Sequence, residues 1–255
     1  MVNTKNLSSI LIVVLTGILP VIPVIASDSG NEPDLSGVWM AFASSPAFMR
    51  GAPTPLTEKG QARVDAYYAQ YGEDFAEPGA YCVPPGMPST MTSIVGYPIE
   101  ILQTRNRVTM LAEMEMQVRR IYMDGRKHPD DYPVTRMGYS IGHWEGEALV
   151  IETALLKESL LRGWPRTEQT RITEKLYLTS RSNVNERPSP FIITEPVGDD
   201  VLVVELTVTD PVLYSNPRKV TMYYQRIEDD AILEYDCPAE HWLNALDAAR
   251  ARQAD

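Results

Sequence analysis

The chain has little of the material from which redox, metal and nucleotide sites are usually built. It holds only two cysteines and three histidines in 255 residues. The cysteines form no Cys-x-x-Cys pair, the histidines form no His-Glu-x-x-His motif, and no glycine-rich phosphate or dinucleotide loop occurs. We therefore expect no redox motif, no metal site of known spacing and no nucleotide, and we predict that the protein uses no cofactor.

Basic side chains are also scarce. Lys and Arg number 23 against 34 Asp and Glu, which gives a formal net charge of −11. An acidic surface repels the phosphates of nucleic acids and the headgroups of anionic lipids. We therefore expect no nucleic-acid partner.

A long hydrophobic run occurs once, near the N-terminus, over residues 10–26. Pro20 and Pro23 interrupt it, whereas a stable transmembrane helix needs about 20 uninterrupted apolar residues. A membrane span is the alternative, but the small and apolar residues at the end of the run are typical of a signal-peptidase site. We predict a signal peptide over residues 1–26 and one exported domain over residues 27–255, periplasmic or secreted, with no membrane span after cleavage.

Export changes the expected oxidation state of the two cysteines, Cys82 and Cys237. In an oxidising compartment, a lone pair of cysteines is more often bridged than free. We therefore predict a disulfide bond between them, with a structural role.

What the chain has in abundance is a repeated β-strand pattern between Tyr97 and Cys237. Short runs of β-branched, aromatic and alternating residues are each closed by a polar turn. Links such as residues 104–107 have the length of hairpin turns, so strands adjacent in sequence should be adjacent in the sheet. The predicted strands cover residues 99–103, 108–113, 117–123, 140–145, 148–153, 170–179, 191–194, 201–209, 219–227 and 232–237.

Two helices are predicted beside these strands. Thr57 is a plausible N-cap for a helix whose apolar positions have i, i+3, i+4, i+7 spacing, namely Val64, Tyr67, Tyr68 and Tyr71. A second helix is expected from residue 238 to about residue 253. The fold class is therefore mostly β: an antiparallel meander that forms a lipocalin-like β-barrel of about 8–10 strands, with a short N-terminal helix and a C-terminal helix.

Alternation within the strands separates an apolar face from a mixed one. Leu202, Val204, Leu206 and Val208 share one face of a predicted strand. The second faces of other strands carry Glu100, Glu113 and Tyr223, which lie either on a solvated outer surface or in a wide lumen around a ligand. On the lumen interpretation, the ligand-binding residues are Trp39, Glu100, Glu113 and Tyr223.

The first predicted strand opens with Gly37-Val38-Trp39. This triplet is similar to the one that begins the barrel of lipocalins, in which the tryptophan closes one end. The alternative is an ordinary core tryptophan on a first strand.

The densest polar chemistry lies between Arg119 and Glu145. His143 or His128 could act as a base near neutral pH, with Glu145 beside one of them. Tyr122, Tyr139 or Arg120 could stabilise an enolate or alkoxide. The alternative is a surface turn at Asp124-Gly125 held by ion pairs. His128, Asp130, Asp131, His143 and Glu145 could also supply metal ligands, but their spacing matches no known metal site.

Gly138-Tyr139-Ser140-Ile141-Gly142 satisfies the Gly-x-Ser-x-Gly pattern of a nucleophile elbow. An elbow needs a turn from a strand into a helix, whereas the residues that follow Gly142 predict a hairpin and a strand. A serine hydrolase that uses Ser140 is therefore the least favoured function.

Two longer segments, residues 119–129 and residues 137–146, resemble a family of exported bacterial proteins of unassigned function. Their letters are RRIYMDGRKHP and MGYSIGHWEG, and the segment of residues 82–88 is similar too. The resemblance implies a β-rich exported protein and names no reaction. This chain has Tyr139 where the family pattern often has histidine, and Arg166-Thr167 where it often has a His-Ser pair.

Two function classes follow. In the first, an exported barrel encloses a small hydrophobic or aromatic molecule and performs cofactor-free acid/base chemistry, as a lyase, isomerase or cyclase. In the second, the barrel is a carrier of the same ligand class and performs no reaction. The sequence carries no signal for the oligomeric state.

Overall fold

The structure of the protein is a computed structural model, in which the described residues lie after the predicted signal peptide. The structure describes residues 32–45, 55–71, 83–92, 97–161, 163–190, 192, 194–228 and 232–236, with single positions 244, 247 and 251. The predicted signal peptide, Cys82 and Cys237 therefore lie outside the described residues, and export and the disulfide stay predictions. No helix of the described part is long and apolar enough to cross a membrane.

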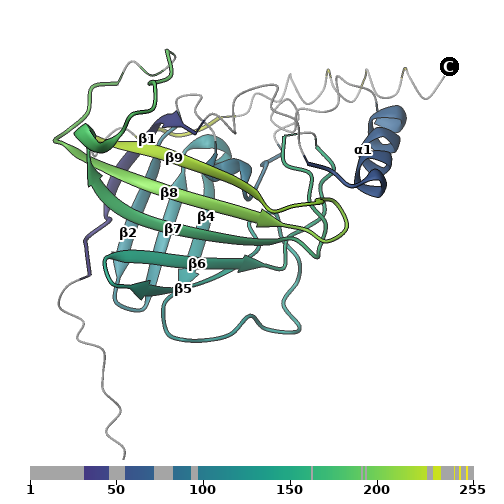
Figure 1. Cartoon of the computed structure of the whole chain (residues 1–255), viewed down its shortest axis with the longest axis horizontal. Coiled ribbons are helices and arrows are strands. Elements are labelled where there is room, and N and C mark those ends of the chain that lie inside the picture. Colours follow the sequence, from purple (N-terminus) through teal and green to yellow (C-terminus); the bar gives the residue numbers. More distant parts are fainter. Residues whose placement is uncertain are drawn as a thin grey trace, which may run out of the picture. The chain divides into compact units, whose positions relative to one another are not determined.

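Nine strands form a closed barrel in the order of the sequence, and the last strand pairs with the first. Figure 1 shows β6 to β9 on the near side of the barrel and β2 and β4 behind them. The predicted mostly β fold and its lipocalin-like barrel are confirmed. The strands are β1 (Gly37–Ser44), β2 (Ile99–Thr104), β3 (Arg107–Ala112), β4 (Gln117–Tyr122), β5 (Tyr139–Glu145), β6 (Ala148–Ala154), β7 (Arg171–Ser180), β8 (Asp200–Thr209) and β9 (Arg218–Ile227).

One pairing differs from the predicted antiparallel meander. β4 and β5 are parallel, and they pair at only two positions, Ile121 with Ser140 and Tyr122 with Ile141. A parallel pair needs a connection that returns to the starting end of the sheet, and residues 123–138 provide it. Asp124-Gly125 therefore forms a bend at the start of this connection.

Two of the predicted strands are wrong for the residues that the structure describes. Ile192, Thr194 and residues 232–236 are not in strands. Ile192 and Ile232 instead pack on the outer side of the barrel beside Val38, Met40 and Ile227. A closed barrel leaves no sheet edge for further strands, so these apolar side chains cover its outside. The predicted C-terminal helix lies outside the described residues, except for three positions that are helical.

The N-terminal helix, α1 (Glu58–Tyr71), forms as predicted. The backbone N–H of Gly60 donates to Thr57 Oγ1 at 2.9 Å, which confirms Thr57 as the N-cap. The Thr57 hydroxyl in turn donates to the carbonyl of Val212 at 2.8 Å. This bond ties the start of α1 to the loop between β8 and β9.

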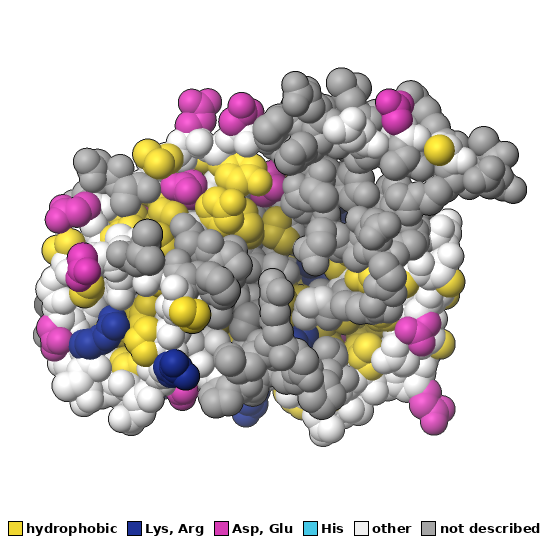
Figure 2. Space-filling view, turned by 90° about the horizontal axis from the view of Figure 1, so that it is seen from above, with side chains coloured by type: hydrophobic (Ala, Val, Ile, Leu, Met, Phe, Trp, Pro, Cys, Tyr) yellow, Lys and Arg dark blue, Asp and Glu magenta, His cyan; other side chains and the backbone are white. Residues whose placement is uncertain are grey.

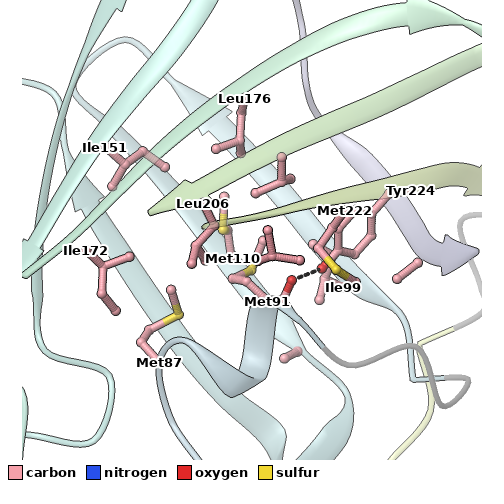
Figure 3. Close-up of a cluster of buried hydrophobic side chains, with 14 of the residues drawn as sticks. Met87, Met91, Ile99, Met110, Ile151, Ile172, Leu176, Leu206, Met222 and Tyr224 are labelled. Atoms are coloured by element: carbon pink, nitrogen blue, oxygen red, sulfur yellow. Dashed lines mark hydrogen bonds between the residues drawn. The ribbon is translucent and has the colours of Figure 1, made fainter. Parts of the chain in front are cut away.

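The barrel interior is packed with apolar side chains. Leu202, Val204, Leu206 and Val208 all belong to the buried core, as their alternation predicts. Met87 and Met91, from a segment that contains the short helix η4 (Ser89–Met91), join the same core. Figure 3 shows them among residues of the strands, with the Tyr224 hydroxyl donating to the Met91 carbonyl at 2.8 Å. The segment therefore fills part of the lumen.

A second apolar layer lies outside β1, β8 and β9. Phe42, Val201 and Val203 form a buried cluster there, covered in part by Val184 and Ile192.

Figure 2 looks at the molecule from above and shows acidic side chains around the rim of this view, in keeping with the net charge of −11.

Candidate functional site

A pocket of about 470 Å³ opens where β4 and β5 diverge. It is lined by residues 115–120 and 135–139, with Pro84, Tyr122 and Tyr132. The parallel pairing begins only at Ile121, so the first residues of β4 have no partner in β5. This gap between the two strands makes room for the pocket.

Gly138 determines how closely the chain can approach β6 as it enters β5. Its φ of +70° is a conformation that side chains disfavour. A Cβ atom at this position would lie 2.6 Å from the carbonyl oxygen of Ala154. The wall of the pocket that residues 135–139 form therefore requires glycine here.

Three tyrosines form an aromatic wall of the pocket. The rings of Tyr122 and Tyr139 are stacked, with centroids 5.0 Å apart and an interplanar angle of 25°. Tyr132 meets Tyr139 edge to face, with centroids 4.9 Å apart. Tyr139 is only 8% exposed, whereas Tyr132 is 40% exposed. Such a wall offers both a ring face and a ring edge to an aromatic ligand.

Arg126 and His128 hold this wall from the side. The Arg126 guanidinium lies 4.0 Å from the centroid of Tyr122, and its Nη1 donates to the Tyr139 hydroxyl at 3.2 Å. Arg126 also forms an ion pair with Asp124, and its hydrogen bond keeps the pKa of that carboxyl below the usual range. The ring of His128 packs edge to face on Tyr139, with centroids 5.9 Å apart.

The hydrogen bond of His128 indicates which of its two ring nitrogens carries the proton. Its Nε2 lies 3.3 Å from the carbonyl oxygen of Glu152. A carbonyl only accepts, so Nε2 carries the proton, and Nδ1 can accept one in the neutral ring. An imidazole in this state beside a phenol is suited to moving a proton.

Three arginines line the pocket, Arg119, Arg120 and Arg136. Arg119 pairs with Glu174, whereas neither Arg120 nor Arg136 forms an ion pair with a carboxylate among the residues that the structure describes. The carboxylate in the lining belongs to Glu115, which accepts a hydrogen bond from the Tyr235 hydroxyl at 3.3 Å. Partial burial raises the pKa of Glu115. Cationic and aromatic groups therefore dominate the pocket.

Arg166 is a buried arginine outside the lining and is 2% exposed. Its Nε donates to the carbonyl of Lys157 at 3.0 Å, and its Nη2 donates to that of Pro85 at 2.9 Å. Burial, followed by the nearby charge of Arg136, lowers the pKa of Arg166 to about 10. Neither Arg136 nor Arg166 forms an ion pair with a carboxylate in the described part of the chain.

The structure brings together four of the six predicted catalytic residues. Arg120, Tyr122 and Tyr139 line the pocket, and His128 packs against Tyr139. The other two, His143 and Glu145, pair with each other at 3.1 Å near the end of β5, with side chains 55% and 59% exposed. His143 therefore lies outside the pocket lining, and the catalytic roles stay predictions.

The predicted ligand-binding residues do not gather at one site. Trp39 is a core residue that is fully buried, and its Nε1 donates to the Leu35 carbonyl at 2.9 Å. Glu100 alternates with two interior residues and so faces outward. Glu113 accepts a bond from the backbone of Leu233, and Tyr223 packs on Phe42 outside the barrel. These placements agree with the outer-surface interpretation, and a ligand contact by any of them stays a prediction.

The barrel interior also contains a polar cluster that the sequence patterns above did not identify. Arg119 and Glu174 are 2% and 0% exposed and face each other across the lumen. Nη1 of Arg119 donates to one carboxylate oxygen at 3.0 Å, and Nη2 donates to the other. The inward periodicity of β4 and β7 could have identified both residues, because each shares a face with buried neighbours.

Ser140 belongs to this interior cluster. Arg119 Nε donates to its Oγ at 3.1 Å, and its hydroxyl lies 2.8 Å from that of Thr153, which also accepts from Arg119. Ser140 is 2% exposed and lies within β5, and the element that follows β5 is the strand β6 and not a helix. It is therefore a structural residue that a substrate cannot reach, which agrees with the low rank of the serine hydrolase.

No group of three or more His, Cys, Asp or Glu side chains is placed to hold a metal ion among the described residues. The acidic and histidine residues between 128 and 145 therefore do not form a metal cluster there. The lining residues can stack on an aromatic ring and bind an anion, and His128 packs on Tyr139 from outside the lining.

No protein-family model matches the chain, and no curated protein matches it. The fold and the pocket therefore carry the functional argument.

Proposed function

We propose that this protein binds a small hydrophobic or aromatic molecule in the pocket between β4 and β5, outside the cytoplasm. The main support is the aromatic wall of Tyr122, Tyr132 and Tyr139 around a space of about 470 Å³. Sites for small molecules commonly enclose about 300–1,000 Å³ and combine apolar surface with a few polar groups. Export rests on the predicted signal peptide and on the resemblance to an exported family.

The pocket replaces the lumen as the binding place in this proposal. Met87, Met91 and Trp39 are buried side chains of the interior core. A ligand in the lumen would have to displace them, at a cost of several kcal/mol in lost packing. A ligand in the pocket would displace only water.

A carrier needs no further chemistry, but one observation favours an enzyme as the second candidate. His128 packs on Tyr139, whose phenol also accepts a hydrogen bond from Arg126. In a lyase, isomerase or cyclase, His128 Nδ1 would take a proton from the bound molecule and return it to another atom. Tyr139 would donate a hydrogen bond to the developing oxyanion, with Arg126 lowering the cost of that charge.

The binding proposal can be tested by filling the pocket. Val118 lines it and is 40% exposed, so Val118→Trp would place an indole in the space. Leu102 is 50% exposed on β2 outside the pocket lining, and Leu102→Trp is the matched control. The probe is N-phenyl-1-naphthylamine, an uncharged aromatic fluorophore. Val118→Trp should weaken its binding at least tenfold, and Leu102→Trp should leave it unchanged.

Equal binding by the wild type and Val118→Trp would show that the pocket is not the site, and no binding by the wild type would refute the proposal. Catalysis is separated from binding by Tyr139→Phe and His128→Gln. If the protein is an enzyme, both variants should retain the probe affinity of the wild type and lose turnover of a ligand that the wild type converts.

A further inference from the structure

The charges around the pocket point to the chemical class of its ligand, an inference that rests on the proposed function. Carboxylates are plentiful in this chain, with 34 Asp and Glu against 23 Lys and Arg. Three arginines of the described chain form an ion pair with one: Arg119 pairs with Glu174, Arg126 with Asp124, and Arg63 with Glu158. Arg120 and Arg136, which line the pocket, have no such partner among the described residues.

Arg136 is half-buried, and part of the hydration that would normally stabilise its charge is lost. Its neighbour Arg166 is more deeply buried and makes hydrogen bonds only to backbone carbonyls in the described structure. The positive charge of Arg136 acts on that of Arg166, and like charges repel each other. An anion beside Arg136 would relieve this repulsion.

Glu115, the carboxylate in the lining, does not serve as the anion beside Arg136. Glu115 lies beside the Tyr235 hydroxyl, from which it accepts a hydrogen bond. Glu115 forms no ion pair with Arg120 or Arg136 among the described residues. A ligand can therefore supply the counter-ion for the guanidinium groups of Arg120 and Arg136.

We propose that the ligand of this pocket is a small aromatic carboxylate. Its ring packs against Tyr122, Tyr132 and Tyr139, and its carboxylate is held by Arg136 and Arg120. A guanidinium matches the two oxygens of a carboxylate in a planar, bidentate arrangement, so it selects this group over a neutral one of the same size.

The test compares two molecules of nearly the same size, the anionic naphthalene-1-acetate and the neutral naphthalene-1-acetamide, as competitors of N-phenyl-1-naphthylamine. The carboxylate should bind the wild type at least tenfold more tightly than the amide. Arg136→Gln should remove most of this preference and leave the affinity for the amide unchanged. Arg120→Gln should reduce the preference by a smaller factor, because Arg120 is more exposed and its charge is better screened by water.

The matched control is Arg105→Gln, which removes the same charge at an exposed position in the turn between β2 and β3. It should keep the full preference, which separates a local effect from the change in net charge. Equal affinities for carboxylate and amide in the wild type, or an unchanged preference in Arg136→Gln, would overturn the inference. The proposed function would survive that result if Val118→Trp still abolished probe binding, whereas loss of all probe binding would refute both.

Discussion

Arg119 and Arg120 are neighbours on β4, yet they have opposite environments. The Arg119 side chain enters the barrel, where Glu174, Ser140 and Thr153 accept hydrogen bonds from it. The Arg120 side chain is exposed at the pocket and has no carboxylate partner in the described chain. Alternation along a strand thus separates a structural arginine from one that is free to bind a ligand.

The interior pair is satisfied completely, and this limits what it can do. Within the described part of the chain, no buried side-chain nitrogen or oxygen lacks a hydrogen-bond partner. A buried ion pair adds little to stability compared with apolar packing, but removing one member leaves an uncompensated charge. The interior pair should therefore matter for folding, and the pocket arginines for binding.

The same substitution at the two neighbours should give the largest contrast. Arg119→Met leaves Glu174 buried without a partner, and we expect a loss of about 3–5 kcal/mol in the free energy of unfolding. Arg120→Met should change it by less than about 0.5 kcal/mol. Urea unfolding followed by circular dichroism measures both. Similar losses for the two variants would contradict the division of roles.

A second substitution should repair the first. Removing both charges with Arg119→Met and Glu174→Leu leaves an apolar pair of similar volume, and Ser140 and Thr153 can still bond to each other. We expect the double variant to regain at least half of the stability that Arg119→Met loses. A double variant that is less stable than either single variant would mean that the pair is worth more than its apolar replacement.

Asp210 is a buried carboxylate that has no arginine partner in the described chain, in contrast to Glu174. Asp210 accepts hydrogen bonds from the backbone and hydroxyl of Thr167, from Thr170 and from the backbone N–H groups of Val212 and Leu213. Burial alone would raise the pKa of Asp210, but these bonds, led by those from Thr170 and Thr167, outweigh it and lower the pKa. Asp210→Asn turns an amide NH₂ toward these donors, so we expect it to cost about 1.5–3 kcal/mol at pH 7.

The pH dependence of this cost has a definite sign. A lowered folded-state pKa means that the stabilisation is fully present above the unfolded value of about 3.9 and is lost as the pH falls through the folded value. Unfolding curves of the wild type and Asp210→Asn should therefore converge below about pH 4. A difference that stays constant down to about pH 2 would show that the charge of Asp210 is not the source.

Arg226 represents a third use of arginine, between the two neighbours on β4. Its guanidinium lies 4.3 Å from the centroid of the Trp39 ring, and its Nη1 donates to the Ser36 carbonyl at 2.6 Å. These contacts join β9 to β1 where the barrel closes. Arg226→Met should cost about 1–2 kcal/mol, measured by urea unfolding. A loss as large as that of Arg119→Met would place Arg226 with the buried group.

The smallest effect is expected at the exposed histidine. His143 and Glu145 form a pair whose side chains are more than half exposed, and such pairs contribute little. His143→Gln should change stability by less than about 0.5 kcal/mol and leave probe binding unchanged. A clear loss of binding would return His143 to the site and weaken the case for the pocket.

Much of the fold could be predicted, because strand periodicity is a local property. The strand at residues 201–209 and the inward positions Leu202 and Val204 follow from alternation alone. Residues 191–194 and 232–237 are also rich in apolar residues, but Ile192 and Ile232, which the structure describes, cover the outside of the barrel. Composition identifies an apolar segment without telling whether it pairs with a sheet or packs on its surface.

The candidate site could be predicted only in part. Tyr122, Tyr139 and His128 were recognisable as a concentration of phenols and a histidine in one stretch of sequence. Arg136 and Arg166 carried no such signal, because what distinguishes them is the lack of a carboxylate partner in the described fold. That relation depends on segments that are far apart in the chain, as the bond from Arg166 to Pro85 illustrates.

The sequence by itself determined the order of the strands, their inward and outward faces and the N-cap of α1, because each depends on residues close together in the chain. Only the tertiary structure decided that β5 runs parallel to β4, that a pocket opens where they part, and that Arg119 meets Glu174. These features depend on how the barrel closes and on the path of residues 123–138. Contacts across a closed barrel follow its register, which no local pattern specifies.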